Sequence, residues 1–152
     1  MLSDNDINLL AFTQTLELTT RDLYLTVVGL KTLSEDEGAL LAQFHSHHVA
    51  YEQSLNGLLS KNAATARNET VFADFATRLS TSSTPWATLL EIENTLVATH
   101  AKTIESIESA KVAALMASII IVEARQAAIL ATLTTSDLSA ALDNNAIVLV
   151  AS

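Results

Sequence analysis

Residues 34–60 decide the fold, and they read SEDEGALLAQFHSHHVAYEQSLNGLLS. The first four, Ser34 to Glu37, form the Ser-x-x-Glu pattern of a capping box, in which two side chains satisfy backbone N–H groups at a helix start. Apolar residues then recur every three or four positions, which is the spacing of one helix face. The stretch therefore predicts a long amphipathic helix with acidic residues in its first turn.

The remainder of the chain has the same helical character. Of its 152 residues, 49% are hydrophobic and only 5% aromatic, with three glycines and one proline. So few helix breakers favour long helices, whereas a β-sandwich would need many more turn residues. The apolar periodicity predicts four long helices. They cover about residues 4–28, 34–60, 85–108 and 111–132.

The connections between these helices predict their topology. The first two helices are joined by a short turn, as are the last two, so each pair is antiparallel. The linker over 61–84 is long and contains a short amphipathic segment, about 69–79. A short helix over about 136–142 and an apolar tail over 146–151 follow. We expect one all-α domain, residues 1–152: an antiparallel four-helix bundle with a long crossover between helices two and three.

The net charge of the chain limits the kinds of partner that it can bind. The chain has 17 acidic residues against 8 Lys and Arg, a net charge of −9, and no cysteine. Binding to nucleic acid needs clustered cations, so we expect no nucleic-acid partner. The longest charge-free apolar run, 112–122, is too short to span a bilayer, which predicts no membrane span. No signal peptide precedes the first helix, so we expect a cytoplasmic protein if Met1 is native; a removed leader would leave the same sequence.

Polar side chains interrupt each apolar stripe near its middle. A buried ionised carboxylate is costly unless it is paired or bound to a cation. These groups therefore share protons, form ion pairs or hold a metal, and carboxylates with imidazoles suit iron, manganese or zinc. A structural polar network without metal is the alternative. The residues are Glu17 on the first helix, His45, His48 and Glu52 on the second, Glu93 and His100 on the third, and Glu123 and Gln126 on the fourth.

Four short motifs carry a family resemblance. They are Leu16-Glu17 with Tyr24 seven residues later, the stretch 44–56 around His47-His48, Ile92-Glu93-Asn94-Thr95, and Ile121-Val122-Glu123-Ala124-Arg125. In order and spacing, over about residues 7–133, they resemble the small bacterial ferritin-like domain proteins. The resemblance implies a ferritin-like bundle with a metal site at its middle, used in iron or manganese handling or oxidation.

The resemblance also implies which residues bind the metal. The family pattern has a Glu on helices one and three and a Glu-x-x-His on helices two and four. Glu17, His48, Glu93 and Glu123 match ligand positions, and Glu52, His100 and Gln126 are expected as auxiliary residues. His45 stands in place of the second-helix Glu, and Gln126 in place of the fourth-helix His.

Those two departures reduce the negative charge of the metal site and leave a weak amide donor, Gln126, in place of an imidazole. The resemblance therefore implies either a one-metal site using Glu17, His45, His48 and Glu123, or an empty site. A non-enzymatic bundle that serves as a structural or interaction module is the alternative function. Whether the protein is an enzyme stays open.

The last long helix predicts self-association. Ile119 to Val122 are four consecutive β-branched residues, which cover every side of a helical turn. A helix that is apolar all round must be covered on its outer side. We therefore expect a homo-oligomer, with a dimer favoured. The apolar tail could add an extended strand to a neighbouring chain.

Overall fold

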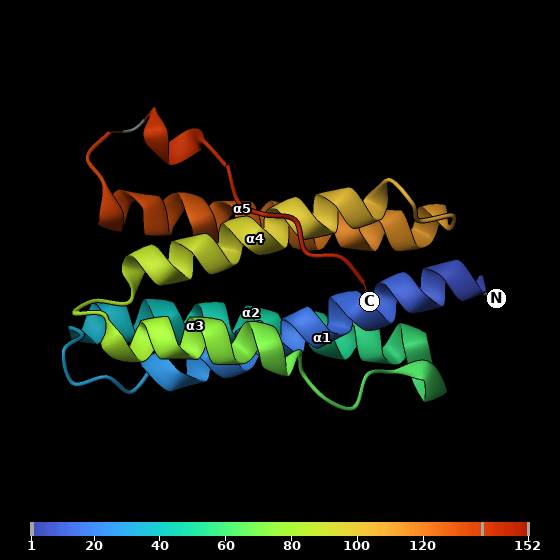
Figure 1. The fold of residues 1–152 in the computed structure, drawn as a ribbon, viewed down its shortest axis with the longest axis horizontal. Helices are drawn as coiled ribbons and strands as arrows, with labels where there is room; N and C mark the ends of the chain where they lie inside the picture. Colours follow the sequence, from blue (N-terminus) through green and yellow to red (C-terminus); the bar gives the residue numbers. More distant parts are fainter. Residues whose placement is uncertain (1, 138, 152) are drawn as a thin grey trace. The chain divides into compact units, whose positions relative to one another are not determined.

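The computed structural model describes residues 2–137 and 139–151, which fold into five α-helices (Figure 1). No strand occurs among these residues, and the all-α prediction is confirmed. The helices are α1 (Asp4–Val27), α2 (Glu35–Leu59), α3 (Glu69–Thr81), α4 (Trp86–Ile104) and α5 (Ala110–Thr134), with short 3-10 helices η1 (Ser60–Asn62) and η2 (Ala140–Leu142). The four long predicted helices correspond to α1, α2, α4 and α5.

The chain is organised into two compact units. The first, here called the crossover unit, is Leu10–Pro85 and holds most of α1 with α2 and α3. The second, the hairpin unit, combines the chain up to Leu9 with everything from Trp86 onward, including α4 and α5. Each unit is described separately, and a single domain over the whole chain stays a prediction.

The predicted capping box is present at the start of α2. The backbone N–H of Glu37 donates to Ser34 Oγ over 3.3 Å, and that of Ser34 donates to Glu37 Oε2 over 2.7 Å. The bond from the Ser34 backbone lowers the pKa of the Glu37 carboxyl. The two reciprocal bonds satisfy N–H groups that a helix start leaves without helical partners.

Side chains of α1 form hydrogen bonds with the backbone of the linker between α2 and α3. The N–H of Ala64 donates to Gln14 Oε1 over 2.7 Å, and the N–H of Asn68 donates to Thr19 Oγ1 over 2.9 Å. Asn68 in turn caps α3 by accepting from the N–H of Val71. The linker therefore follows α1, and the short helix predicted over 69–79 is confirmed as α3.

The joint between α4 and α5 is longer than expected. The third helix was predicted to reach residue 108, but α4 ends at Ile104. Past this end the N–H groups of Ser106 and Ile107 bond three residues back, to the carbonyls of Thr103 and Ile104. The Asp6 carboxylate then accepts from the next two, with Oδ1 2.8 Å from the N of Glu108 and Oδ2 3.0 Å from that of Ser109. These N–H groups therefore bond to a side chain of α1 instead of continuing the α4 hydrogen-bond ladder.

The chain beyond α5 is less helical than predicted. In place of a helix over 136–142 there is only η2, and residue 138 lies outside the described residues. Asp137 Oδ1 accepts from the N–H groups of Ser139 and Ala140, the bonding of a helix N-cap, but the regular helical segment after it is only the three residues of η2. The helix expected there was therefore wrong in type and length.

The apolar tail lies along α4 of its own chain. Asn144 donates from its side chain to the carbonyl of Asn94, and the N–H of Leu149 donates to Thr99 Oγ1, both over 3.0 Å. Ile147 and Val150 remain 82% and 80% exposed. The tail thus has an anchor within the hairpin unit, although it still presents apolar side chains to solvent.

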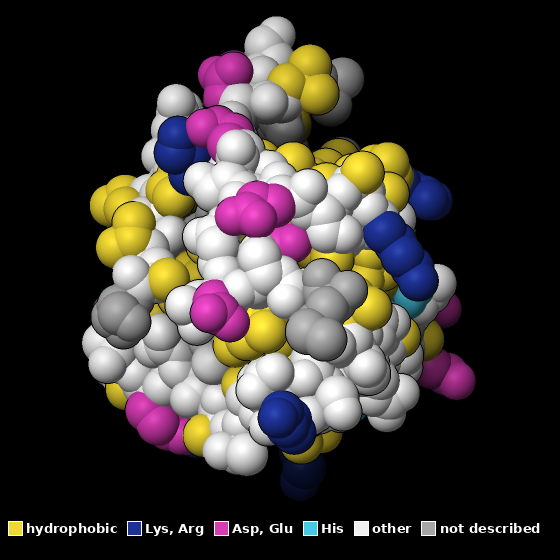
Figure 2. Space-filling model, turned by 90° about the vertical axis from the view of Figure 1, so that its right-hand side faces the viewer, with side chains coloured by type: hydrophobic (Ala, Val, Ile, Leu, Met, Phe, Trp, Pro, Cys, Tyr) yellow, Lys and Arg dark blue, Asp and Glu magenta, His cyan; other side chains and the backbone are white. Residues whose placement is uncertain are grey.

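Surface charge is dispersed on the face drawn in Figure 2. Acidic side chains are spread over this face, and the Lys and Arg side chains stand apart from one another. This pattern agrees with a net charge of −9. The absence of a nucleic-acid partner stays a prediction.

The outer face of α5 is apolar. Within the described residues, α5 is the one helix long and apolar enough to cross a membrane by length and composition, with 33% of its most apolar window buried. A core helix of a soluble protein has the same composition, so the predicted absence of a membrane span stays a prediction. Exposed apolar residues, five alanines and one isoleucine, recur at spacings of three and four, which is the spacing of a coiled-coil seam. They are Ala110, Ala114, Ala117, Ile121, Ala124 and Ala128.

We expect this seam to pair with that of a second copy. A regular seam suits a helix partner, and the net charge of −9 opposes an anionic membrane surface. Light scattering at micromolar concentration should give at least twice the chain mass of 16.2 kDa. Ile121→Glu should lower that mass, whereas Leu25→Glu should not, although Ile121 and Leu25 are similarly exposed, at 62% and 64%. A monomeric wild type, or equal effects of both variants, would contradict this expectation.

Candidate metal centre

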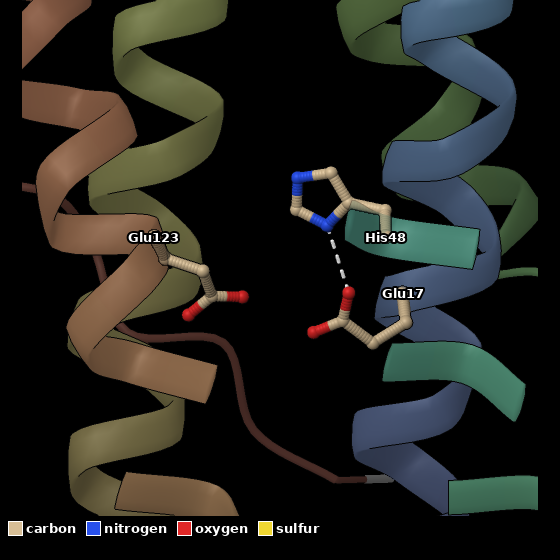
Figure 3. A group of neighbouring side chains, drawn as sticks. All are labelled: Glu17, His48 and Glu123. Carbon is tan, nitrogen blue, oxygen red and sulfur yellow. Dashed lines mark hydrogen bonds and ion pairs between the residues drawn. The ribbon is translucent and has the colours of Figure 1, made fainter. Parts of the chain in front are cut away.

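The crossover unit contains one fully buried glutamate–histidine pair. Glu17 on α1 and His48 on α2 are both 0% exposed, and His48 Nδ1 lies 2.8 Å from Glu17 Oε2 (Figure 3). With Glu17 ionised, its carboxylate can only accept a hydrogen bond, and the imidazole then donates from Nδ1. The second ring nitrogen, Nε2, points away from Glu17 (Figure 3).

Aromatic rings fix the orientation of His48. The Tyr24 ring stacks on the imidazole with centroids 5.3 Å apart, and Phe44 meets Tyr24 edge-on at 6.0 Å. Tyr24 is fully buried, and Phe44 is 3% exposed. Because the carboxylate holds one ring nitrogen and Tyr24 covers a ring face, His48 is preorganised in one orientation.

The hairpin unit contains a second pair of the same kind. His100 on α4 and Glu123 on α5 are both 0% exposed, and His100 Nδ1 lies 3.0 Å from Glu123 Oε2. Figure 3 shows Glu123 on its helix. His100 was expected only as an auxiliary residue, and the structure pairs it with a predicted ligand position. The hairpin unit therefore has a histidine beside its glutamate even though Gln126 replaces the expected one.

The buried charges of the chain are mostly acidic. Glu93 is 0% exposed, so Glu17, Glu93 and Glu123 are three fully buried carboxylates, while Gln126 is 1% exposed. The buried basic groups among the described residues are His48 and His100, and no buried Lys or Arg accompanies them. Even with both imidazoles protonated, the carboxylates would be in excess. A divalent cation would supply the missing positive charge.

His45 and Glu52, also predicted on α2, lie in more open surroundings. Both are half-buried. Burial lowers the pKa of His45 below its ordinary 6.5, and the positive charge of Arg21 lowers it further. Glu52 accepts from the side chain of Gln14 over 3.0 Å. Whether either residue contributes to metal binding stays a prediction.

Two residues near the Glu17–His48 pair were not predicted from the sequence. Gln14 is fully buried; its side chain donates to Glu52 and accepts from the backbone N–H of Ala64 in the linker. Tyr51 packs edge-on against His48 with ring centroids 5.9 Å apart. Helix spacing could have indicated Tyr51, since it follows His48 by three positions and thus shares its side of α2. Gln14 has the same three-residue relation to Glu17.

The donor chemistry fits a divalent transition metal. Glu17, His48 and Glu123 each offer a buried ligand atom of the carboxylate or imidazole type. Iron, manganese and zinc accept such oxygen and nitrogen donors, whereas softer ions favour sulfur, which no cysteine supplies. Both histidines are bonded to carboxylates through Nδ1, the arrangement that commonly orients metal-binding imidazoles.

Comparison with known proteins identifies the family. The model of the ferritin-like domain matches residues 5–136, which include α2 to α5 and all of α1 except its first residue. No curated protein and no solved structure matches the chain. The match agrees with the all-helical fold and with the motifs on the four long helices, and covers most of the sequence. The chain belongs to the ferritin-like domain family.

Proposed function

We propose that the protein binds one divalent transition metal through its buried glutamate–histidine pairs. The observation that supports this most is that each unit holds one such pair, fully buried and joined through His Nδ1. The ferritin-like pattern draws ligands for one centre from four helices. The family match covers all four, which is the reason for assigning both pairs to one metal.

In this proposal the histidine and the glutamate of each pair have different roles. The ligand nitrogens are Nε2 of His48 and of His100, because Nδ1 of each ring is bonded to a carboxylate. Glu17 and Glu123 hold these rings in orientation and supply oxygen donors. Their negative charge raises the basicity of the imidazoles and favours the cation. Metal uptake requires neutral imidazoles, so it would release any proton that the pairs hold.

A single metal fits the donor set better than two. Two metals need bridging carboxylates and a full set of ligands. Here His45 and Gln126 occupy two positions at which the family pattern has a carboxylate and an imidazole, and His45 is only half-buried. Iron or manganese bound there would supply one-electron redox chemistry, whereas zinc would supply none.

The second candidate function is a structural or interaction module with a degenerate metal site. It is favoured by one observation: the buried imidazoles of His48 and His100 are each hydrogen-bonded to a buried glutamate of the same chain. Polar networks of this kind can specify packing in a helical bundle. Metal content separates this candidate from the first.

Elemental analysis tests the proposed function directly. After expression with supplemented iron, manganese or zinc, we expect about one metal per chain. Glu17→Gln/Glu123→Gln should weaken binding by about 100-fold or more, since removal of one supporting group typically weakens it 10–100-fold. The matched control is Glu35→Gln, which changes an exposed carboxylate in the first turn of α2 and should retain the metal. A metal content near zero under every condition would support the structural module instead.

A further inference from the structure

The C-terminal segment, residues 143–151, is fixed to α4 by two hydrogen bonds. The side-chain amide of Asn144 donates to the carbonyl of Asn94 over 3.0 Å. Further along, the N–H of Leu149 donates to Thr99 Oγ1, also over 3.0 Å. Asn144 Oδ1 in addition accepts from the N–H of Ala146, so one side chain fixes both the turn of the segment and its contact with α4. Within the hairpin unit, the C-terminal segment thus follows α4 from Asn94 to Thr99.

This part of α4 joins two buried residues of the candidate metal centre. Glu93 directly precedes it and His100 directly follows it, and both are 0% exposed. Nδ1 of His100 lies 3.0 Å from Glu123 Oε2, and its Nε2 is a proposed ligand nitrogen. Local opening of α4 between the two contact points would therefore displace a proposed metal ligand.

The C-terminal segment is held loosely enough to leave α4. The three most exposed large hydrophobic side chains among the described residues are Leu142, Ile147 and Val150, at 84%, 82% and 80%. Because these side chains bury little apolar surface, the hydrophobic effect contributes little to docking of the segment. Segments with few buried apolar contacts open at a much lower free energy than the whole protein unfolds. The segment can therefore lift while the helices stay folded.

We infer that the C-terminal segment is a strap that restrains α4 and sets how fast a bound metal leaves. This inference rests on the proposed function and adds a means of controlling the same site. The docked segment opposes local opening of α4 through its two hydrogen bonds. When the segment lifts, α4 opens more often and His100 lets go of the metal more often. A ligand of buried residues departs through such openings, so docking slows its release.

The strap lies outside the part of the chain that the family match covers. The match to the ferritin-like domain ends at residue 136, whereas both contacts with α4 come from residues beyond 143. Control of metal release by the C-terminal segment is therefore a property of this chain in addition to its ferritin-like domain.

Two substitutions each remove one contact with little change of shape. Asn144→Asp keeps an acceptor oxygen but loses the amide that donates to α4, and Thr99→Val replaces the acceptor hydroxyl with a methyl group. Each has a matched control. Asn145→Asp makes the same charge change at the exposed neighbouring residue. Thr103→Val removes a hydroxyl one turn further along α4, which donates to a carbonyl of its own helix.

Release of metal to a chelator tests the inference in the full chain. Protein loaded with the metal that elemental analysis shows it to retain, at equal content in every variant, is mixed with excess EDTA. We expect Asn144→Asp and Thr99→Val each to speed release several-fold, and the double variant to speed it further. Asn145→Asp and Thr103→Val should release metal at the wild-type rate.

Hydrogen exchange of the metal-free protein gives a second readout that needs no metal. The amides of residues 94–100 should exchange several-fold faster in Asn144→Asp and Thr99→Val, because α4 opens more often. The amides of α2 should exchange at the wild-type rate. This difference separates local opening of α4 from a general loss of stability.

The outcomes distinguish this inference from the function on which it rests. Unchanged release and unchanged exchange in Asn144→Asp and Thr99→Val, at full metal content, would overturn the inference alone. An equal acceleration in the two controls would also overturn it, since the cause would then be the charge or the lost hydroxyl in general. A wild type that retains no metal would overturn the proposed function and the control of metal release with it, whatever hydrogen exchange shows about α4.

Discussion

Replacing His48 with leucine in the metal-free protein should lower the free energy of unfolding by about 3–5 kcal/mol, the range for breaking a buried ion pair on one side. The substitution leaves Glu17 in a fully buried position without its imidazole partner. Near neutral pH that carboxylate must then either stay charged in a poorly solvating environment or take up a proton, and both alternatives are unfavourable. Urea denaturation in the presence of a chelator measures the loss.

The double variant Glu17→Leu/His48→Leu should recover most of that loss, or exceed the stability of the wild type. Two leucines fill a similar volume and bury no charge, and such replacements of buried pairs are often neutral or stabilising. The double variant should still weaken metal binding. His47→Leu is the control: His47 neighbours His48 but is only half-buried, so its replacement should change stability by about 0.5 kcal/mol or less.

The result would show what the buried pair contributes. Recovery in the double variant means that Glu17 and His48 are retained at the expense of stability, as expected of a functional site. This comparison also needs the single variant Glu17→Leu. If the double variant loses as much stability as His48→Leu and Glu17→Leu together, the pair is a structural element, and the second candidate function gains support.

Local patterns in the sequence predicted the helices because their signals are short-range. The capping box of Ser34 and Glu37 involves residues three apart, and the structure contains both of its hydrogen bonds. The apolar stripes likewise placed Glu17, Glu93 and Glu123 on inward faces, and all three are fully buried. Helical periodicity determines which side of a helix a residue occupies, so these placements needed no tertiary information.

Contacts between residues that are distant in sequence could not be predicted from such local patterns. Nothing local indicates that His100 Nδ1 lies beside Glu123, or that Gln14 connects Glu52 to the backbone of Ala64. His45 shows the limit of periodicity within a helix. It precedes His48 by three positions, about 60° away around the helix, and that rotation leaves it half-buried near Arg21.

Asp6 also makes contacts that local sequence patterns could not predict. Its sequence context, Ser3-x-x-Asp6, resembles a capping box, and Ser3 Oγ does accept from the N–H of Asp6 over 3.2 Å. The Asp6 carboxylate accepts from the N–H groups of Glu108 and Ser109, about a hundred residues further along the chain. Ser109, the N-cap of α5, makes no side-chain cap bond of its own.

Asp6→Ala should therefore destabilise the protein by about 3 kcal/mol, since each of the two hydrogen bonds to the charged carboxylate contributes roughly 1.5–3 kcal/mol and their effects are not fully additive. The side chain is 1% exposed, so water cannot readily replace it. The loss of a negative charge beside the start of α5 adds to the effect. Chemical denaturation measures the total, and hydrogen exchange at the amides of Glu108 and Ser109 should accelerate.

Two variants separate the carboxylate contact from a general charge effect. Asp6→Asn keeps one acceptor oxygen, so it should be destabilised by less than Asp6→Ala. Asp4 lies in the same first turn of α1 but is exposed, and Asp4→Ala should change stability by about 0.5 kcal/mol or less. If Asp4→Ala were as harmful as Asp6→Ala, the charge of the first turn would be responsible. If only Asp6 matters, its two hydrogen bonds stabilise the α4–α5 joint.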